Sequence, residues 1–180
     1  VNFATFCALE DHFAGQGESR GWPQWPSEYR HPASSGVISF RQSNENAVDF
    51  HRWMQFELDR QLASAAARAH KSGLGIGIYQ DLAIGAAPDS ADVWAFGHLF
   101  LTGVSVGAPP DGYAPQGQNW GLPPIDPRQL AEDRYAFWIP LLRASPRHAC
   151  AIRPDPLPAP FTPFWLPAGL PGNVGRASSW

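Results

Sequence analysis

Arg153 and Asp155 are the charged residues whose types and spacing best suit a chemical reaction. Side chains two residues apart on an extended chain point to the same face, so the guanidinium would lie beside the carboxylate. A neighbouring cation keeps a carboxylate ionised and oriented, as a carboxylate nucleophile requires. Prolines flank Asp155 on both sides, however, and Asp in such a context is also a common turn residue. A catalytic and a structural interpretation of Asp155 are both open.

A second group of polar and aromatic residues lies between positions 89 and 120. Asp89 precedes a serine, so it either stabilises a turn or supplies a further carboxylate. The other members are side chains that could hydrogen-bond a ligand or stack on it, namely Asp111, Gln118, Asn119, Trp120 and Trp94. The polar residues could equally be ordinary loop residues, and the two tryptophans could equally belong to the core. His148 has no partner at metal-ligand spacing, so we expect no metal site.

The elements that would position these residues alternate between helices and strands. Apolar residues recur at three- and four-residue spacing from Ala47 to Ser72, which predicts a helix that ends at Gly73. The almost uncharged run from Leu74 to Ile84 follows and predicts a buried parallel strand. A second helix should begin after Asp126, which is a good N-cap residue, with Gln129 as its capping-box partner.

Two long segments without a regular period complete the pattern. Residues 85–124 are rich in glycine and proline and predict a long loop, and a further strand should span Ala149 to Arg153. This order predicts the α/β class, as a partial (β/α)8 TIM-type barrel with long strand-to-helix loops. Residues 1–153 would form this central portion of a barrel, and the proline-rich residues 154–180 would form an irregular tail.

The composition narrows the class of protein. Among the 180 residues, 44% are hydrophobic and 16% are charged, which suits a chain with a packed core. The net charge is -3 and there is no Lys/Arg run, so we expect neither nucleic acid nor a membrane as a partner. Two distant cysteines, the absence of a signal sequence and the absence of a long apolar span favour the cytoplasm.

Three segments together resemble the amylomaltase family of 4-alpha-glucanotransferases. They are Asp89 to Trp94 (DSADVW), Gly107 to Pro124 with the motifs GAPPD and GQNWGLPP, and Leu141 to Asp155 (LLRASPRHACAIRPD). The similarity covers nearly the whole chain as far as Arg153, and it returns at Phe164 to Gly169 (FWLPAG).

The resemblance implies roles for the residues named above. In that family an Arg-x-Asp at the end of a barrel strand carries the nucleophile, and Arg153 and Asp155 occupy the corresponding positions. The family has Arg-Ile-Asp-His where this chain has Arg-Pro-Asp-Pro. Asp89 would be an early active-site carboxylate. A general acid/base Glu and a stabilising Asp follow the nucleophile in the family, whereas no Asp or Glu follows Asp155 in this sequence.

The implied reaction is the transfer of α-1,4-glucan segments between malto-oligosaccharides or other α-1,4-glucans, by a retaining double displacement without a metal or an organic cofactor. Such a reaction requires two carboxyl groups about 5 to 5.5 Å apart. Three other interpretations are open. They are an inactive glucan-binding fragment that lacks the general acid/base, a hydrolase of the same barrel class, and a non-enzymatic module that binds partners through the proline-rich tail.

Overall fold

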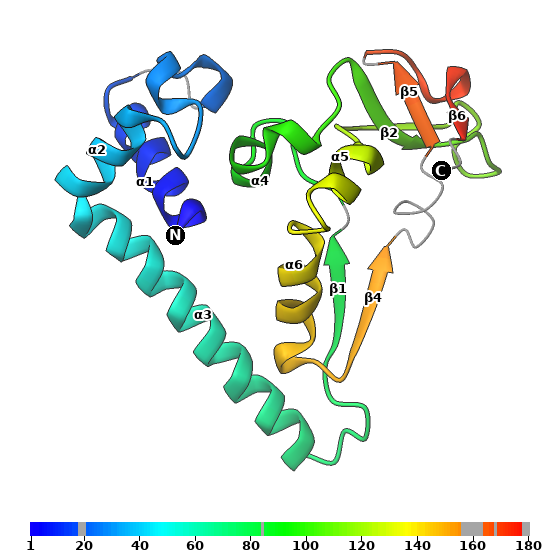
Figure 1. Cartoon of the computed structure of the whole chain (residues 1–180). Coiled ribbons are helices and arrows are strands. Elements are labelled where there is room, and N and C mark those ends of the chain that lie inside the picture. The colour runs from blue at the N-terminus through cyan, green and yellow to red at the C-terminus, as the bar shows by residue number, and fades with distance from the viewer. Residues whose placement is uncertain (18–20, 84, 156–163, 168, 178–180) are drawn as a thin grey trace. The chain divides into compact units, whose positions relative to one another are not determined.

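The computed structural model describes residues 1–17, 21–83, 85–155, 164–167 and 169–177. The chain forms two compact units. The first contains Val1–Arg68 and Asp89–Gly97, and the second contains Ala69–Pro88 and His98–Trp180. Helices and strands are both present (Figure 1), so the predicted α/β class is confirmed.

The first unit is helical and is built around an aromatic core. Its elements are α1 (Asn2–Gly15), η1 (Trp22–Gln24), η2 (Ser27–Tyr29), α2 (Ser35–Ser43), most of α3 (Glu45–Lys71) and α4 (Ala91–Ala95). The ring of Phe6 lies 5.3 Å from that of Trp25 and 5.5 Å from that of Trp94, and both tryptophans are fully buried. Aromatic pairs at these separations attract each other. The core therefore holds the short helix α4 in place.

Helix α3 confirms the first predicted helix. It spans Glu45–Lys71, within two residues of the predicted range at each end. Gly73 follows with a φ of 84°, a left-handed conformation that glycine adopts without strain. The N–H of Gly73 donates to the carbonyl of His70, and the N–H of Leu74 donates to the carbonyl of Ala69. These two bonds form the Schellman cap that the glycine predicted.

Apolar side chains of α3 are exposed in the described structure. Phe50 is 53% exposed and Leu58 is 51% exposed. Because exposed apolar surface favours association in water, we expect the isolated 180-residue chain to self-associate. The double variant Phe50→Ser/Leu58→Gln should shift it toward the monomer in size-exclusion chromatography with light scattering. An equal shift in the polar control Asp49→Asn, or a monomeric wild-type chain, would contradict this explanation.

The second unit contains the two parallel strands. β1 (Tyr79–Ala83) pairs with β4 (Ala151–Asp155), with Tyr79 opposite Ala151 and Ala83 opposite Asp155. The helices α5 (Pro127–Glu132) and α6 (Trp138–Ala144) separate these strands in sequence. The predicted order of strand, helix and parallel strand is therefore present. β1 is shorter than the predicted strand, and β4 lies two residues further along the chain than predicted.

The predicted second helix begins as expected but is interrupted. The carboxylate of Asp126 caps α5 by accepting a bond of 2.8 Å from the backbone N–H two residues on. Gln129 is not a capping-box partner, because its side chain donates to a glutamate three residues further along. Arg134 and Tyr135 then adopt left-handed conformations, with φ of 52° and 59°. These residues break the helix, and Pro140 falls in the first turn of α6, where a proline is tolerated.

A four-stranded antiparallel sheet corrects two predictions of irregular structure. Its strand order is β3 (Gln118–Leu122), β2 (Val104–Ala108), β5 (Phe164–Pro167) and β6 (Arg176–Ala177). β2 and β3 lie within residues 85–124, which were predicted to be a loop. β5 and β6 lie within the tail that was predicted to be irregular. Only the last residue of β5 is a proline, so Phe164 to Leu166 keep the N–H groups that pairing requires.

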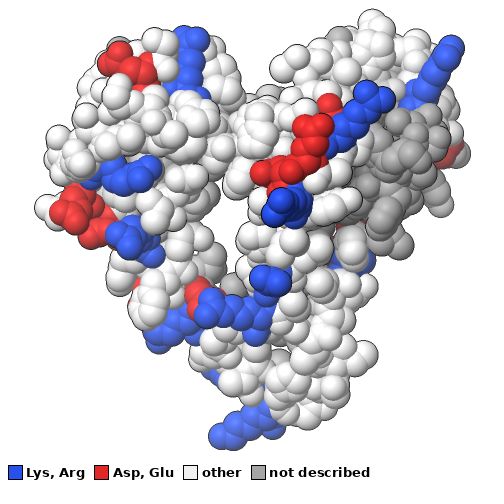
Figure 2. Space-filling view, viewed as in Figure 1, with Lys and Arg blue, Asp and Glu red and all other residues white. Residues whose placement is uncertain are grey.

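Charged residues are sparse on the face of the molecule that Figure 2 shows. On the face that Figure 2 shows, Lys and Arg lie among Asp and Glu and most of the surface is uncharged. This distribution agrees with the charged fraction of 16%. Among the helices of the described residues, none is both long and apolar enough to cross a membrane.

The two cysteines should differ in reactivity. Burial, with smaller contributions from the charges of Glu10 and Asp11, raises the pKa of Cys7 to about 11. Cys150 is exposed. At about pH 8 a thiol with such a pKa is roughly one part in a thousand ionised, and only the thiolate reacts. We therefore expect one fast reaction with a disulfide reagent, which Cys150→Ser should abolish and Cys7→Ser should preserve. A fast phase that survives in Cys150→Ser would contradict this assignment.

Candidate active site

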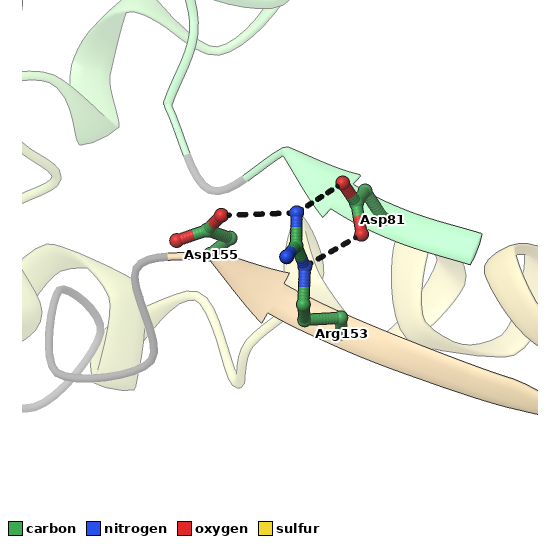
Figure 3. Close-up of polar contacts among 3 residues, drawn as sticks. All are labelled: Asp81, Arg153 and Asp155. Atoms are coloured by element: carbon green, nitrogen blue, oxygen red, sulfur yellow. Dashed lines mark hydrogen bonds and ion pairs between the residues drawn. The ribbon is translucent and has the colours of Figure 1, made fainter. Parts of the chain in front are cut away.

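Arg153 and Asp81 form a two-bond ion pair across the parallel strands. The pairing of β1 with β4 places these residues directly opposite each other, so their side chains leave the same face. Nε of Arg153 donates to Oδ1 of Asp81 at 2.8 Å, and Nη2 donates to Oδ2 at 2.6 Å. This geometry, drawn in Figure 3, fixes the plane of the guanidinium.

Asp155 contacts the same guanidinium through a single oxygen. Nη2 of Arg153 lies 3.2 Å from Oδ2 of Asp155, and Figure 3 shows the other oxygen of Asp155 turned away from Arg153. The hydrogen bonds and charge of Asp81, and then the charge of Asp155, raise the pKa of Arg153 above its ordinary value. The guanidinium is therefore a permanent cation beside Asp155. The structure thus brings Arg153 and Asp155 together as their spacing predicted, while their catalytic role stays a prediction.

The three charged side chains lie on an exposed face at the carboxyl end of the strand pair. Asp155 is the last residue of β4, opposite the last residue of β1. The side chains of Asp81, Arg153 and Asp155 are 60%, 50% and 59% exposed. Leu82, on the opposite face of β1, is buried. Ligands of parallel β/α folds bind at the carboxyl ends of the strands, so Asp155 is accessible at the edge where such ligands bind.

Asp81 is absent from the residues that sequence reasoning placed in the site. One signal was available, since Asp81 is the only charged residue in the run from Leu74 to Ile84. A charge within a strand that is otherwise apolar requires a partner. The identity of that partner depends on the register of β1 against β4, and residue spacing does not predict this register.

Asp89 lies in the other unit, one residue before the N-cap of α4. Ser90 forms that cap, because its hydroxyl accepts a hydrogen bond of 3.4 Å from the N–H of Val93. Asp89 itself is exposed. Because Asp89 and Asp155 belong to different units, the role of Asp89 as a second site carboxylate stays a prediction.

Asp111 stabilises a turn in the segment between β2 and β3. Its Oδ1 accepts the backbone N–H of Tyr113 at 2.8 Å and that of Ala114 at 2.6 Å. This is the hydrogen-bond pattern by which Asp side chains form turns. Oδ1 of Asp111 is thus occupied by the bonds that form the turn. A hydrogen bond from Asp111 to a ligand would therefore use its other oxygen, Oδ2.

Gln118, Asn119 and Trp120 are consecutive residues of β3, and their polar groups take part in local bonds. Oε1 of Gln118 accepts a bond of 2.9 Å from Nε1 of Trp120. Oδ1 of Asn119 accepts a bond of 2.7 Å from the hydroxyl of Ser105, and its Nδ2 donates to the carbonyl of Leu170, also at 2.7 Å. Asn119 therefore ties β3 to β2 and to residue 170. A role in binding a ligand stays a prediction for these three residues.

Trp94 is a core residue. It is only 1% exposed, and its Nε1 donates to the carbonyl of Tyr29 at 2.8 Å. A ligand that stacks on an indole needs an exposed ring face, which Trp94 does not offer. The prediction that Trp94 binds substrate is therefore wrong for this structure, and its alternative interpretation as a core residue holds.

Comparison with known proteins shows to which protein family the chain belongs. A sequence model of the 4-alpha-glucanotransferase family matches residues 1–176. The chain belongs to the 4-alpha-glucanotransferase family. The resemblance inferred from the motifs is thereby confirmed, and the match extends through the proline-rich residues as far as β6.

Two 4-alpha-glucanotransferases show how much of such a protein the chain represents. The Mycobacterium tuberculosis protein is 43% identical over 174 residues, which are 97% of this chain and 23% of the relative. The Haemophilus influenzae protein is 33% identical over 163 residues, which are 89% of this chain and 23% of the relative. The chain therefore spans about a quarter of the length of these 4-alpha-glucanotransferases.

Solved structures agree with this membership of the 4-alpha-glucanotransferase family. The amylomaltase from Corynebacterium glutamicum is 36% identical, with a TM-score of 0.77 over 99% of this chain and 23% of its own. The amylomaltase from Streptococcus agalactiae in complex with acarbose is 22% identical, with a TM-score of 0.83 over 99% of this chain and 36% of its own. The second likeness concerns the fold alone. The chain has the fold of part of an amylomaltase.

Proposed function

We propose that the full-length gene product transfers α-1,4-glucan segments between malto-oligosaccharides, with Asp155 as the nucleophile. The observation that carries the proposal is an accessible Asp155 carboxylate 3.2 Å from the Arg153 guanidinium, at the carboxyl end of a strand, in a chain of this family. The acarbose complex of one amylomaltase neighbour supports a carbohydrate ligand.

The proposed reaction has two displacements at one sugar carbon. In the first, an oxygen of Asp155 attacks the anomeric carbon of the donor, the glycosidic C–O bond breaks, and a general acid protonates the leaving oxygen. In the second, the same group accepts the proton of an acceptor hydroxyl, whose oxygen attacks the anomeric carbon and displaces Asp155. Each displacement inverts the carbon, so the configuration is retained overall. Arg153 would stabilise the negative charge that Asp155 regains in the second step.

The general acid/base in this proposal comes from polypeptide outside the 180 residues. No Asp or Glu follows Asp155 in this sequence. The carboxylate that shares a cation with Asp155 belongs to Asp81, and both of its oxygens accept hydrogen bonds from Arg153. Asp81 is therefore badly placed to donate a proton to a leaving group.

The remaining predicted residues are assigned around this centre. We place β1 and β4 as two strands of a (β/α)8 barrel whose central portion is residues 1–153. Asp89 would approach Asp155 from the segment after β1, and the ligand contacts would come from Asp111 and from Gln118, Asn119 and Trp120 of β3. A cytoplasmic location and a reaction without a cofactor belong to the same proposal.

A second candidate function concerns the 180-residue chain by itself, which would bind α-glucan without catalysing its transfer or hydrolysis. The absence of any acidic residue after Asp155 favours this state, because the second carboxyl group that the reaction requires would be missing. The alternative of a polyproline ligand depends largely on residues 156–163, which lie outside the described residues.

Incubation of the full-length gene product with maltotriose tests the proposed reaction. Transfer should yield malto-oligosaccharides longer than the substrate while the total concentration of reducing ends stays constant. A rise in reducing ends without longer products would instead identify a hydrolase, and unchanged maltotriose would contradict both activities. The isolated 180-residue chain, assayed in parallel, should leave maltotriose unchanged.

A further inference from the structure

Asp81 is bound to Arg153 more closely than Asp155 is. Both Asp81 oxygens accept hydrogen bonds, at 2.8 and 2.6 Å, whereas Asp155 lies 3.2 Å from the same guanidinium through one oxygen. The strand register explains why Arg153 binds Asp81 more closely than Asp155. Asp81 lies directly opposite Arg153, while Asp155 lies two residues further along β4. Figure 3 shows the guanidinium between the two carboxylates. Arg153 is therefore held by Asp81 and faces Asp155.

This arrangement matters because a guanidinium has two ways of meeting a carboxylate. A fork of two parallel hydrogen bonds is the favoured geometry, and it occupies both carboxylate oxygens. A carboxylate bound in that way has less free electron density for attack on carbon. An arginine without a second partner would be free to form such a fork with the nearest carboxylate, and on this face that carboxylate is Asp155.

We propose that Asp81 is a positioning residue, which holds the Arg153 guanidinium so that a single Nη2 group faces Asp155 and one Asp155 oxygen stays available for attack. This inference rests on the proposed function. The pKa of Arg153 agrees with the assignment, since the hydrogen bonds and charge of Asp81 raise it more than the charge of Asp155 does. Ala83, which lies opposite Asp155 in the strand register, is exposed.

The variant Asp81→Asn in the full-length gene product tests the proposal. We expect kcat for maltotriose transfer to fall roughly 10- to 100-fold while KM stays within about twofold, because in this proposal Asp81 acts on the reacting carboxylate through Arg153 rather than by binding the sugar. Asp81→Glu keeps a charged acceptor and should recover part of the lost kcat. The matched control is Glu57→Gln, which removes an exposed ion pair of 2.8 Å with Arg60 on α3 and should leave kcat unchanged.

The double variant Asp81→Asn/Arg153→Met shows whether Asp81 acts through Arg153. Once Arg153 is gone, loss of Asp81 should have little further effect, so the two changes in kcat should be strongly non-additive. Additive effects would overturn the proposal, as would a loss in Asp81→Asn that appears in KM alone. Circular dichroism and a thermal midpoint within about 3 °C of the wild type confirm that each variant is folded.

Failure of this inference is distinguishable from failure of the proposed function. If Asp155→Asn is inactive while Asp81→Asn keeps the wild-type kcat, Asp81 has no positioning role and the proposed function stands. If Asp155→Asn transfers glucan normally, the proposed function is wrong and the role of Asp81 falls with it.

Discussion

Asp155→Asn should lower kcat for glucan transfer on the order of 10⁴-fold or more, because the amide has the shape of the carboxylate but cannot form the glycosyl ester. The fold should be unaffected, since the Asp155 side chain is 59% exposed and its ion pair with Arg153, at 3.2 Å, lies on an exposed face. Initial rates with maltotriose, measured on the full-length gene product with circular dichroism alongside, give the comparison.

A second surface aspartate provides the control for this substitution. Asp49 on α3 is 52% exposed and pairs with Arg52 at 2.9 Å, so it resembles Asp155 in exposure and in having an arginine partner. Asp49→Asn should keep the wild-type kcat. Activity in Asp155→Asn above about 1% of the wild type would be incompatible with a nucleophile at this position.

Arg153→Met should lower kcat roughly 10²- to 10³-fold, because it leaves two carboxylates on one face without the cation between them. The charge of Asp155 would then be stabilised less well when it departs from the sugar in the second displacement. Arg153→Lys keeps the charge but not the fork that holds Asp81, so it should lose only about tenfold. Steady-state measurements should place the effect in kcat, with a smaller change in KM.

The order of kcat among these variants distinguishes the loss of an electrostatic interaction from a general disruption of the fold. Wild type, Arg153→Lys and Arg153→Met should form a descending series in kcat while their thermal midpoints stay similar. Arg52→Met, which removes the partner of Asp49 on α3, is the matched control and should behave as wild type. An Arg153→Met enzyme with nearly full activity would mean that Asp155 does not depend on the neighbouring cation.

Features that depend on a few neighbouring residues could be predicted from the sequence. The extent of α3 and its cap at Gly73 follow from an apolar period and one left-handed glycine. The cap formed by Asp126 is equally local. The contact between Arg153 and Asp155 follows from the geometry of alternate residues on a strand. Each of these predictions needed only the residues of the element itself or those within a few residues of it.

Features that depend on distant parts of the chain could not be predicted in this way. β2 pairs with β5, about sixty residues away. The two segments that contain these strands, residues 85–124 and 154–180, are rich in glycine and proline, and this composition predicted irregular structure instead of strands. Burial distinguishes Trp94 in the core from the half-buried Trp120, although both are tryptophans in family motifs. The partnership of Asp81 with Arg153 required the register of β1 against β4. In each case the missing information was tertiary.

Covalent labelling of the nucleophile tests the central claim most directly. A 5-fluoro-α-maltosyl fluoride carries a good leaving group, while its ring fluorine slows both displacements, so the glycosyl-enzyme should accumulate in the full-length gene product. Proteolysis and mass spectrometry should then find the maltosyl adduct on the peptide that contains Asp155, and no adduct in Asp155→Asn. An adduct on Asp81, on Asp89 or on a carboxylate outside these residues would contradict the account.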